Sequence, residues 1–190
     1  NLEGVDIFIS TSLLMKQEEC LFELVGALDF DHALQRVDFR APEKAYALLC
    51  GLLGITKGRL IIQTGLARHH VFSAIKDENH AYFYDTELTQ RRQINFPPYS
   101  HLGLVKVRGK SQEKVKLQAE RIFAQLVEKK IGAVDIVSLN PSQPQKLRGN
   151  FYYQILLKSR SALTLAKFID ERVKHISRSS MTTTFDIDPL

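Results

Sequence analysis

The chain of 190 residues has two cysteines, Cys20 and Cys50, and no tryptophan. Two thiols cannot form a disulfide framework or a four-thiolate zinc site, so we expect a reducing, cytoplasmic compartment. Ten glycines and six prolines are too few for a fibrous or low-complexity chain, and 44% apolar residues exclude a disordered one. No apolar run approaches the roughly 18–20 residues that cross a bilayer, so no membrane partner is expected. A globular protein of one large or two small domains remains.

Positive charge is concentrated in the second half of the chain. Residues 1–98 carry 10 Lys and Arg against 13 Asp and Glu, a net charge of −3. Residues 99–190 carry 16 against 8, a net charge of +8. This excess favours a polyanion such as nucleic acid as the partner of the second half only.

The first half predicts a parallel α/β sheet. Continuous apolar runs predict strands at Val5–Ile9, Leu24–Leu28 and Gly58–Gln63, and helical spacing extends from Pro42 to Gly54 and over residues 71–94. Runs without alternation are typical of parallel strands buried on both faces. Three strands are few for such a sheet, and the chain begins at Asn1 with no initiator methionine or signal-peptide pattern. We therefore expect a piece of a longer protein whose opening strands lie upstream, with this half less stable than the second.

The second half begins after Phe96-Pro97-Pro98-Tyr99, where the prolines end any preceding helix. The patterns that follow predict strands at His101–Arg108, Val134–Leu139, Phe151–Lys158 and Met181–Ile187, and helices at Ser111–Ile131 and Ser161–Ile176. Ser111 is the expected N-cap of the first helix, and a polar, proline-bearing loop is expected over Asn140–Asn150. The order β-α-β-β-α-β predicts a ferredoxin-like domain, with both helices on one face of the sheet.

Catalytic signals are weak. The chain has neither Gly-x-x-x-x-Gly-Lys-Ser/Thr nor Gly-x-Gly-x-x-Gly, so no phosphate-cradling loop is recognisable. Asp29 and Asp31 could hold a metal at a strand end, but a solvated strand end is the favoured interpretation. His69 and His70 are adjacent and are expected to point apart, which makes them a poor metal pair. We predict no catalytic or metal site in this chain.

Basic and aromatic residues interleave near residue 150, which favours single-stranded or branched nucleic acid. Lys146 and Arg148 precede the strand that carries Tyr152 and Lys158, and Arg160 follows it. Strand alternation places Tyr152, Gln154, Leu156 and Lys158 on one face, away from the helices. Lys106 and Arg108 are expected beside them. The predicted DNA-binding residues are Lys146, Arg148, Tyr152, Lys158, Arg160, Lys106 and Arg108; the alternative is an ordinary half-exposed edge.

The sequence resembles the PriA family of primosomal replication-restart helicases over nearly its whole length. In the first half the resemblance lies in Asp6–Lys16, Leu24–Asp29, Asp38-Phe39-Arg40-Ala41-Pro42-Glu43-Lys44, Gln63-Thr64, and Arg91-Arg92 before Phe96–Tyr99. In the second half it lies in Lys146-x-Arg148-Gly149, Gln154–Leu157 and Asp186–Pro189. The resemblance implies the C-terminal part of a RecA-like helicase lobe over 1–76, a helical linker over 77–98, and a C-terminal DNA-binding domain over 99–190.

The departures from the family bear on ATP hydrolysis. Leu52 and Ile55 occupy the positions of two motor arginines that reach the γ-phosphate in the family, and leucine cannot neutralise a phosphate. Ser10-Thr11 and Lys16-Gln17 replace glycine-bearing pairs, and Tyr152 replaces an arginine. The family's nucleotide-binding loop and zinc insertion would lie upstream. This chain is therefore expected to hold no cofactor, and ATP with Mg²⁺ and zinc would belong to a longer parent protein.

Three functional hypotheses follow from the residues and the resemblance. The first is a DNA-binding segment that recognises branched or forked DNA for primosome assembly. The second is part of an ATP-dependent 3′-to-5′ DNA helicase. The third is a primosome scaffold that binds single-stranded-DNA-binding protein and other primosome proteins.

Overall fold

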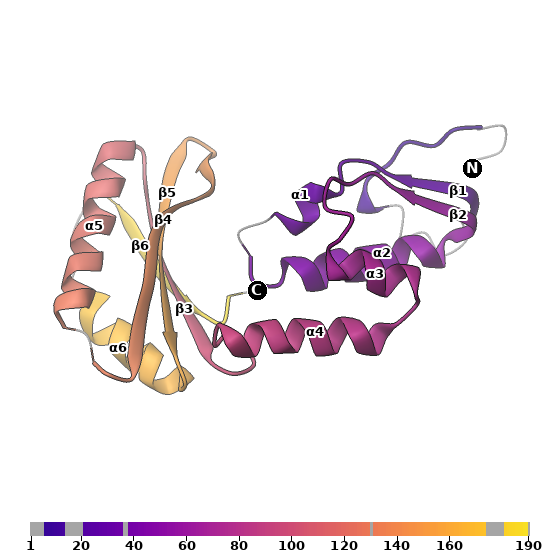
Figure 1. Ribbon diagram of the computed structural model, residues 1–190. Helices are drawn as coiled ribbons and strands as arrows, with labels where there is room; N and C mark the ends of the chain where they lie inside the picture. The colour runs from indigo at the N-terminus through magenta and orange to yellow at the C-terminus, as the bar shows by residue number, and fades with distance from the viewer. Residues whose placement is uncertain (1–5, 14–20, 36–37, 130, 174–180, 190) are drawn as a thin grey trace. The chain divides into compact units, whose positions relative to one another are not determined.

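The computed structural model describes residues 6–13, 21–35, 38–129, 131–173 and 181–189. The chain separates into two compact units, residues 1–88 (unit 1) and residues 89–190 (unit 2). The fold is mixed α/β, because unit 1 holds a two-stranded parallel sheet and unit 2 a four-stranded antiparallel sheet (Figure 1). In the described part of the chain, no helix is long and apolar enough to cross a membrane.

Unit 1 is built on a parallel pair of strands. Strand β1 (Phe22–Ala27) pairs with β2 (Thr56–Ile62), and between them along the chain come α1 (Asp31–Leu34) and α2 (Ala41–Gly54). The predicted strands at Leu24–Leu28 and Gly58–Gln63 are therefore confirmed, as is the helix that ends at Gly54. Pro42 lies in the first turn of α2, where its missing N–H costs no hydrogen bond.

The core of unit 1 is rich in aromatic side chains and lies among α2, α3 (His70–Lys76) and α4 (His80–Gln93). Tyr46 of α2 stacks on Phe83 of α4, with ring centroids 3.9 Å apart. Its hydroxyl also lies 2.5 Å from Nδ1 of His80. These contacts hold α4 against α2. The buried residues of α4 are Phe83 and Glu87.

The prediction of one helical stretch over residues 71–94 is wrong, because the helix is interrupted between Lys76 and His80. Glu78 has a positive φ of 48°, and the N–H of Asn79 donates to the carbonyl of Ala74 at 2.9 Å. This is the Schellman arrangement that ends a helix. The side chain of Asn79 then accepts from the N–H of Tyr82 at 2.9 Å and so caps the start of α4.

Two further expectations for the first half are wrong. The described part of the Val5–Ile9 prediction, residues 6–9, forms no strand, and Ile9 is 93% exposed. The paired strands are also not buried on both faces, since Leu24 and Ile61 are exposed while Val25 is buried. A strand needs a paired neighbour for its backbone and a covering layer for each apolar face, and the described residues of unit 1 do not supply both.

Unit 2 follows the order β-α-β-β-α-β. Its elements are β3 (His101–Gly109), α5 (Gln112–Glu128), β4 (Val134–Leu147), β5 (Asn150–Ser159), α6 (Ala162–Val173) and β6 (Thr182–Ile187). The strands lie in the spatial order β4-β5-β3-β6, and every neighbouring pair is antiparallel. The strands and helices predicted for this half are confirmed, apart from the last turn up to Ile176, which lies outside the described residues. Ser111 caps α5 as expected, since its hydroxyl accepts from the N–H of Lys114 at 3.5 Å.

The polar loop expected over Asn140–Asn150 is instead a long β-hairpin. Strand β4 continues to Leu147, and Arg148 and Gly149 form the turn with φ of 48° and 77°. Two consecutive positive φ values define the type I′ turn that suits a two-residue hairpin. The prediction of a loop relied on the prolines of this segment. β4 is an edge strand, and there a residue without an N–H can face solvent without breaking the ladder.

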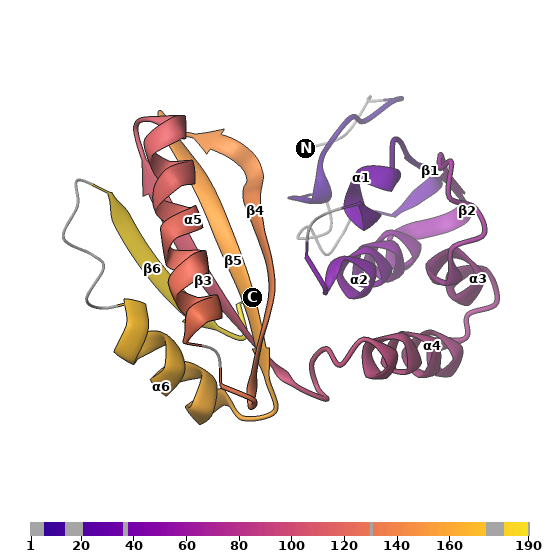
Figure 2. The same ribbon diagram turned by 60° about the vertical axis from the view of Figure 1, so that its left-hand side comes forward.

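Helices α5 and α6 cover the same face of the sheet in unit 2 (Figures 1 and 2). Tyr153, Ile155 and Leu157 of β5 are buried in the core beneath them, as alternation predicts. The other face, which we call the open face, has no helix of the described part of unit 2 against it. It presents the alternate residues of the two central strands, β3 and β5.

Candidate nucleic-acid interface

Three of the seven predicted DNA-binding residues lie together on the open face. In the antiparallel pair of β3 and β5, Arg108 lies opposite Tyr152 and Lys106 lies opposite Gln154. Directly opposite residues have Cβ atoms about 4.5–5.5 Å apart, so the side chain of Arg108 is a direct neighbour of that of Tyr152. Arg108 is exposed, whereas Lys106 and Tyr152 are half-buried. Two central strands thus present two positive charges and one aromatic side chain to solvent.

The polar neighbours of this cluster were not predicted from the sequence. On β6, Thr184 lies opposite Lys106 and Thr182 lies opposite Arg108. On β4, Asn140 lies opposite Gln154, whose amide oxygen also accepts from Ser142 at 3.4 Å. The register of four strands brings these residues together. The Arg148–Gly149 turn bears on the register between β4 and β5, but the pairings of β3 with β5 and β6 join segments far apart in the chain.

Lys146 and Arg148 lie at the hairpin end of β5. Lys146 is opposite Phe151, and its ammonium group lies 5.2 Å from the centre of that ring. Such a contact orients the amine while leaving it exposed to solvent. Arg148 occupies the first position of the type I′ turn and is exposed. Arg148 therefore adds an exposed positive charge at the end of β5 next to Tyr152. Lys146 shares the face of Phe151, which is the helix side of the sheet, and does not belong to the open-face cluster.

Lys158 lies at the other end of β5 and is engaged within the fold. Its ammonium group donates to the carbonyl of Ile94 at 3.1 Å and lies 5.9 Å from the ring centre of Phe96. In the same segment, the guanidinium carbon of Arg92 lies 4.8 Å from the ring centre of Tyr99. Lys158 therefore fastens the Ile94–Ser100 segment to the sheet. Arg160 follows β5 and is exposed.

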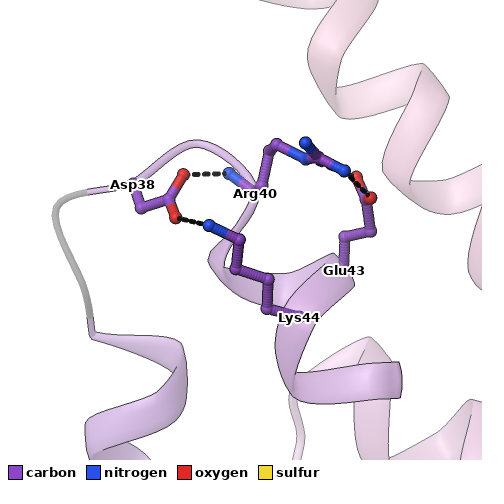
Figure 3. Close-up of polar contacts among 4 residues, drawn as sticks. All are labelled: Asp38, Arg40, Glu43 and Lys44. Atoms are coloured by element: carbon purple, nitrogen blue, oxygen red, sulfur yellow. Dashed lines mark hydrogen bonds and ion pairs between the residues drawn. The ribbon is translucent and has the colours of Figure 1, made fainter. Parts of the chain in front are cut away.

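The Asp38–Lys44 motif, which carries the family resemblance in the first half, forms the start of α2 (Figure 3). Asp38 accepts from the N–H of Arg40 at 2.9 Å and from the ammonium group of Lys44 at 2.7 Å. Arg40 donates to Glu43 at 2.6 Å. Burial opposes ionisation of Asp38, but these two hydrogen bonds and the charges of Lys44 and Arg40 outweigh it and lower its pKa. The motif thus stabilises the first turn of a helix.

Leu52 and Ile55, which replace the motor arginines of the resemblance, serve the fold of unit 1. Leu52 packs against the hydrophobic core of the unit. Its carbonyl accepts from the hydroxyl of Thr56 at 2.6 Å. Ile55 is the C-cap residue of α2. Neither side chain can bind a phosphate.

The acidic and histidine pairs of unit 1 are also used within the fold. Asp31 accepts from the hydroxyl of Thr64 and from the N–H of Gly65, and these bonds lower its pKa. Asp29 contacts His32 at 3.1 Å. Among the described residues, no group of three or more metal-ligating side chains could hold an ion.

The expectation that His69 and His70 point apart is wrong. Their rings stack with centroids 4.4 Å apart, because His69 is the extended N-cap of α3 and not a helical residue. His70 lies 3.2 Å from Glu87, and both side chains are buried. Burial lowers the pKa of His69, and the charge of His70 adds to the effect.

Together, the fold and the candidate site define a two-unit α/β protein whose second unit presents a basic, open sheet face. Residues 92–190 match the family model of the primosomal protein N C-terminal domain, and the chain belongs to that family.

Proteins named replication restart protein PriA are similar to this chain across nearly all of it. The identity is 29% over 191 residues for the Synechocystis protein, 30% over 181 for that of Bacillus subtilis and 29% over 196 for that of Rickettsia conorii. These alignments cover 97%, 91% and 100% of this chain. The chain spans only 23%, 22% and 30% of the length of these relatives. It is thus PriA-like, and it is similar to the C-terminal region of those proteins.

Proposed function

We propose that this chain is the DNA-binding C-terminal part of a replication-restart protein and that it recognises branched or forked DNA for primosome assembly. The observation that carries the proposal is the cluster of Lys106, Arg108 and Tyr152 on the open face. Cations supply contacts to phosphates, and a partly exposed aromatic ring supplies a surface on which a base can stack. Arg148 in the hairpin turn adds an exposed cation at the same end of β5.

A single-stranded arm of a fork fits the open face better than a duplex does. Alternate residues of a strand are about 6.8 Å apart, about twice the 3.4 Å rise per nucleotide of one strand in a duplex. A single strand can extend to that spacing and turn a base onto Tyr152, whereas the bases of a duplex are already stacked on each other. The duplex arm would then contact unit 2 through its phosphates alone.

The finer architecture is part of the proposal. Residues 99–190 would be a ferredoxin-like domain, which the β-α-β-β-α-β order and the strand order β4-β5-β3-β6 support. Residues 1–76 would be the end of a RecA-like lobe, supported by the parallel pairing of β1 with β2. Residues 77–98 would link the two.

Partners and compartment follow from the same family. We propose single-stranded-DNA-binding protein and other primosome proteins as partners, in the cytoplasm. We assign no ATPase step to this chain, since Leu52 and Ile55 lack the positive charge that a γ-phosphate requires.

The proposal is tested by measuring the binding of labelled forked, single-stranded and duplex DNA over a salt series. Tyr152→Ala is expected to lower affinity for single-stranded and forked DNA by about 1–3 kcal/mol, as the loss of one stacked base costs. Lys106→Gln/Arg108→Gln should weaken binding and reduce the slope of log K against log[salt] by about 0.7 per lost phosphate contact on a single strand. A Lys146→Ala/Arg148→Ala variant should also weaken binding.

The matched control is Lys116→Gln/Arg121→Gln, which removes the same charge from exposed positions of α5, the helix on the opposite face of the sheet. This control should leave affinity near that of the unmodified chain. Equal losses in both double variants would show that net charge alone attracts DNA and would contradict the open face as the binding surface.

A further inference from the structure

A pocket of about 420 Å³ lies in unit 2 where four segments meet. Its walls come from the Ile94–Ser100 segment, the start of β4, the end of β5 and the first turn of α6. Tyr99, Asp135, Lys158, Arg160, Ser161 and Thr164 are among the side chains that line it. The volume falls in the range of small-ligand sites, about 300–1,000 Å³.

Three side chains of this pocket offer hydrogen-bond donors to a ligand. Arg160 has no hydrogen-bond or ion-pair partner in the part of the chain that the structure describes, so its five N–H groups are available. Ser161 uses its hydroxyl oxygen to accept from the N–H of Thr164 at 3.2 Å, which leaves its O–H proton for a ligand. Lys158 donates one of its three protons to Ile94 and retains two.

The charges of the lining point to an anion. Lys158 and Arg160 contribute two positive charges, and Asp135 contributes one negative charge. Asp135 lies opposite Lys158 in the β4–β5 pair. The guanidinium of Arg160 offers the planar fork of donors that matches two oxygens of a phosphate, and hydroxyl donors beside it suit the others.

The pocket also lies in line with the open-face cluster. Tyr152 and Lys158 stand on the same face of β5, six residues apart, which corresponds to about 20 Å along a strand. A single strand extended at about 6.8 Å per nucleotide covers that distance in about three nucleotides. A base on Tyr152 and a phosphate in the pocket can therefore belong to one short stretch of DNA.

We propose that this pocket binds a backbone phosphate of a single DNA strand whose neighbouring bases occupy the open face. The inference rests on the proposed function, and it adds a second subsite about three nucleotides from Tyr152. Arg160, Ser161 and Thr164 contact the phosphate, whereas Lys158 adds charge while it holds the Ile94–Ser100 wall.

The test combines two probes with four variants of the full chain, Arg160→Gln, Asp135→Asn, Tyr152→Ala and Arg121→Gln. Inorganic phosphate and the oligonucleotide (dT)8 are titrated separately into ¹⁵N-labelled protein, and amide shifts are followed at Ser161 and Thr164. Arg160→Gln should weaken (dT)8 binding about ten-fold, the worth of one charge-assisted contact, and should abolish the phosphate-induced shifts. Asp135→Asn should strengthen binding of both probes, because it removes the negative charge in the pocket. Arg121→Gln on α5 should change neither the affinity for (dT)8 nor the phosphate-induced amide shifts.

The outcomes separate this inference from the proposed function. If (dT)8 binds and Tyr152→Ala weakens it, but neither Arg160→Gln nor Asp135→Asn alters affinity, the pocket proposal is wrong and the open face stands. If phosphate shifts Ser161 and Thr164 but (dT)8 binds nowhere, both the DNA-binding function and the pocket's role in it are wrong. A length series supports the inference if affinity gained from (dT)2 to (dT)8 is lost in Arg160→Gln, and overturns it if that gain persists unchanged.

Discussion

The charged residues of the motif that resembles the family in the first half of the chain serve the fold. They are Asp38, Arg40, Glu43 and Lys44. Each of the four forms a hydrogen bond or ion pair within the first turn of α2 or just before it. A cluster of four charged residues can be mistaken for a ligand site. Here its charges are paired with each other, so their primary effect is on helix stability.

Asp38→Asn is expected to destabilise unit 1 by about 1 kcal/mol at pH 7, since it removes one charge-assisted bond in a partly exposed site. The pKa of Asp38 is lower in the folded chain than its ordinary value of 3.8. Its contribution is therefore complete above pH 3.8 and is lost as pH falls through the lowered pKa. Urea unfolding followed by circular dichroism should show the difference between variant and unmodified chain shrinking below pH 3.8. A difference that stays constant down to pH 2 would contradict the role of this charge.

Lys158→Gln tests the assignment of Lys158 to the Ile94–Ser100 segment. Removal of the contacts with Ile94 and Phe96 should speed hydrogen exchange at the amides of Phe96 and Tyr99. The melting temperature of the chain should change little, because the contact is at the surface. Lys116→Gln is the control, and it should leave exchange in this segment unaltered. Unchanged exchange in Lys158→Gln would show that other contacts hold the segment.

Helix and strand boundaries depend on turn and capping residues more than on apolar spacing. The Glu78–Asn79 break divides a stretch whose composition predicts one helix, and the Arg148–Gly149 turn converts a predicted loop into a hairpin. Both the helix end and the hairpin turn contain a non-glycine residue with a positive φ, Glu78 and Arg148. Local composition does not predict such a conformation. Where the cap itself is recognisable from the sequence, as for Ser111 at the start of α5, the predicted helix start is confirmed.

Gly103→Ala should destabilise unit 2 by about 1–3 kcal/mol, because β3 and α6 are in direct contact there. A Cβ atom at this position would lie 2.9 Å from Cδ1 of Ile169 and 3.0 Å from Cδ2 of Leu165. The melting temperature should fall by about 4–8 °C for each kcal/mol in a unit of this size. Gly132→Ala is the matched control, since nothing lies within 4 Å of a Cβ there. Equal melting temperatures for the two variants would contradict the close packing of α6 on β3.

The two units differ in how completely their sheets are covered. Unit 2 has four strands with two helices on one face, and its core residues are almost fully buried. The described residues of unit 1 form two strands with exposed apolar side chains, among them Leu24 and Ile61 at 60% and 56% exposure. An isolated two-stranded sheet is only marginally stable in water.

Hydrogen exchange of the whole chain should therefore show lower protection in β1 and β2 than in β3 and β5. The physical reason is that opening of unit 1 exposes less buried apolar surface. Exchange followed by mass spectrometry at pH 7 resolves the two units by their peptides. Equal protection in both units of a monomer would contradict the lower stability of unit 1.

The sequence by itself determined the secondary-structure order of unit 2, the inward face of β5 and the concentration of positive charge after residue 98. These features depend on periodicity, capping and composition, which are local properties of the chain. Only the tertiary structure decided that Thr182 lies opposite Arg108, that Lys158 is bound to Ile94, and that Arg160 shares a pocket with Thr164. Each of these contacts depends on strand register or on segments distant along the chain, and such pairings arise from packing of the whole unit.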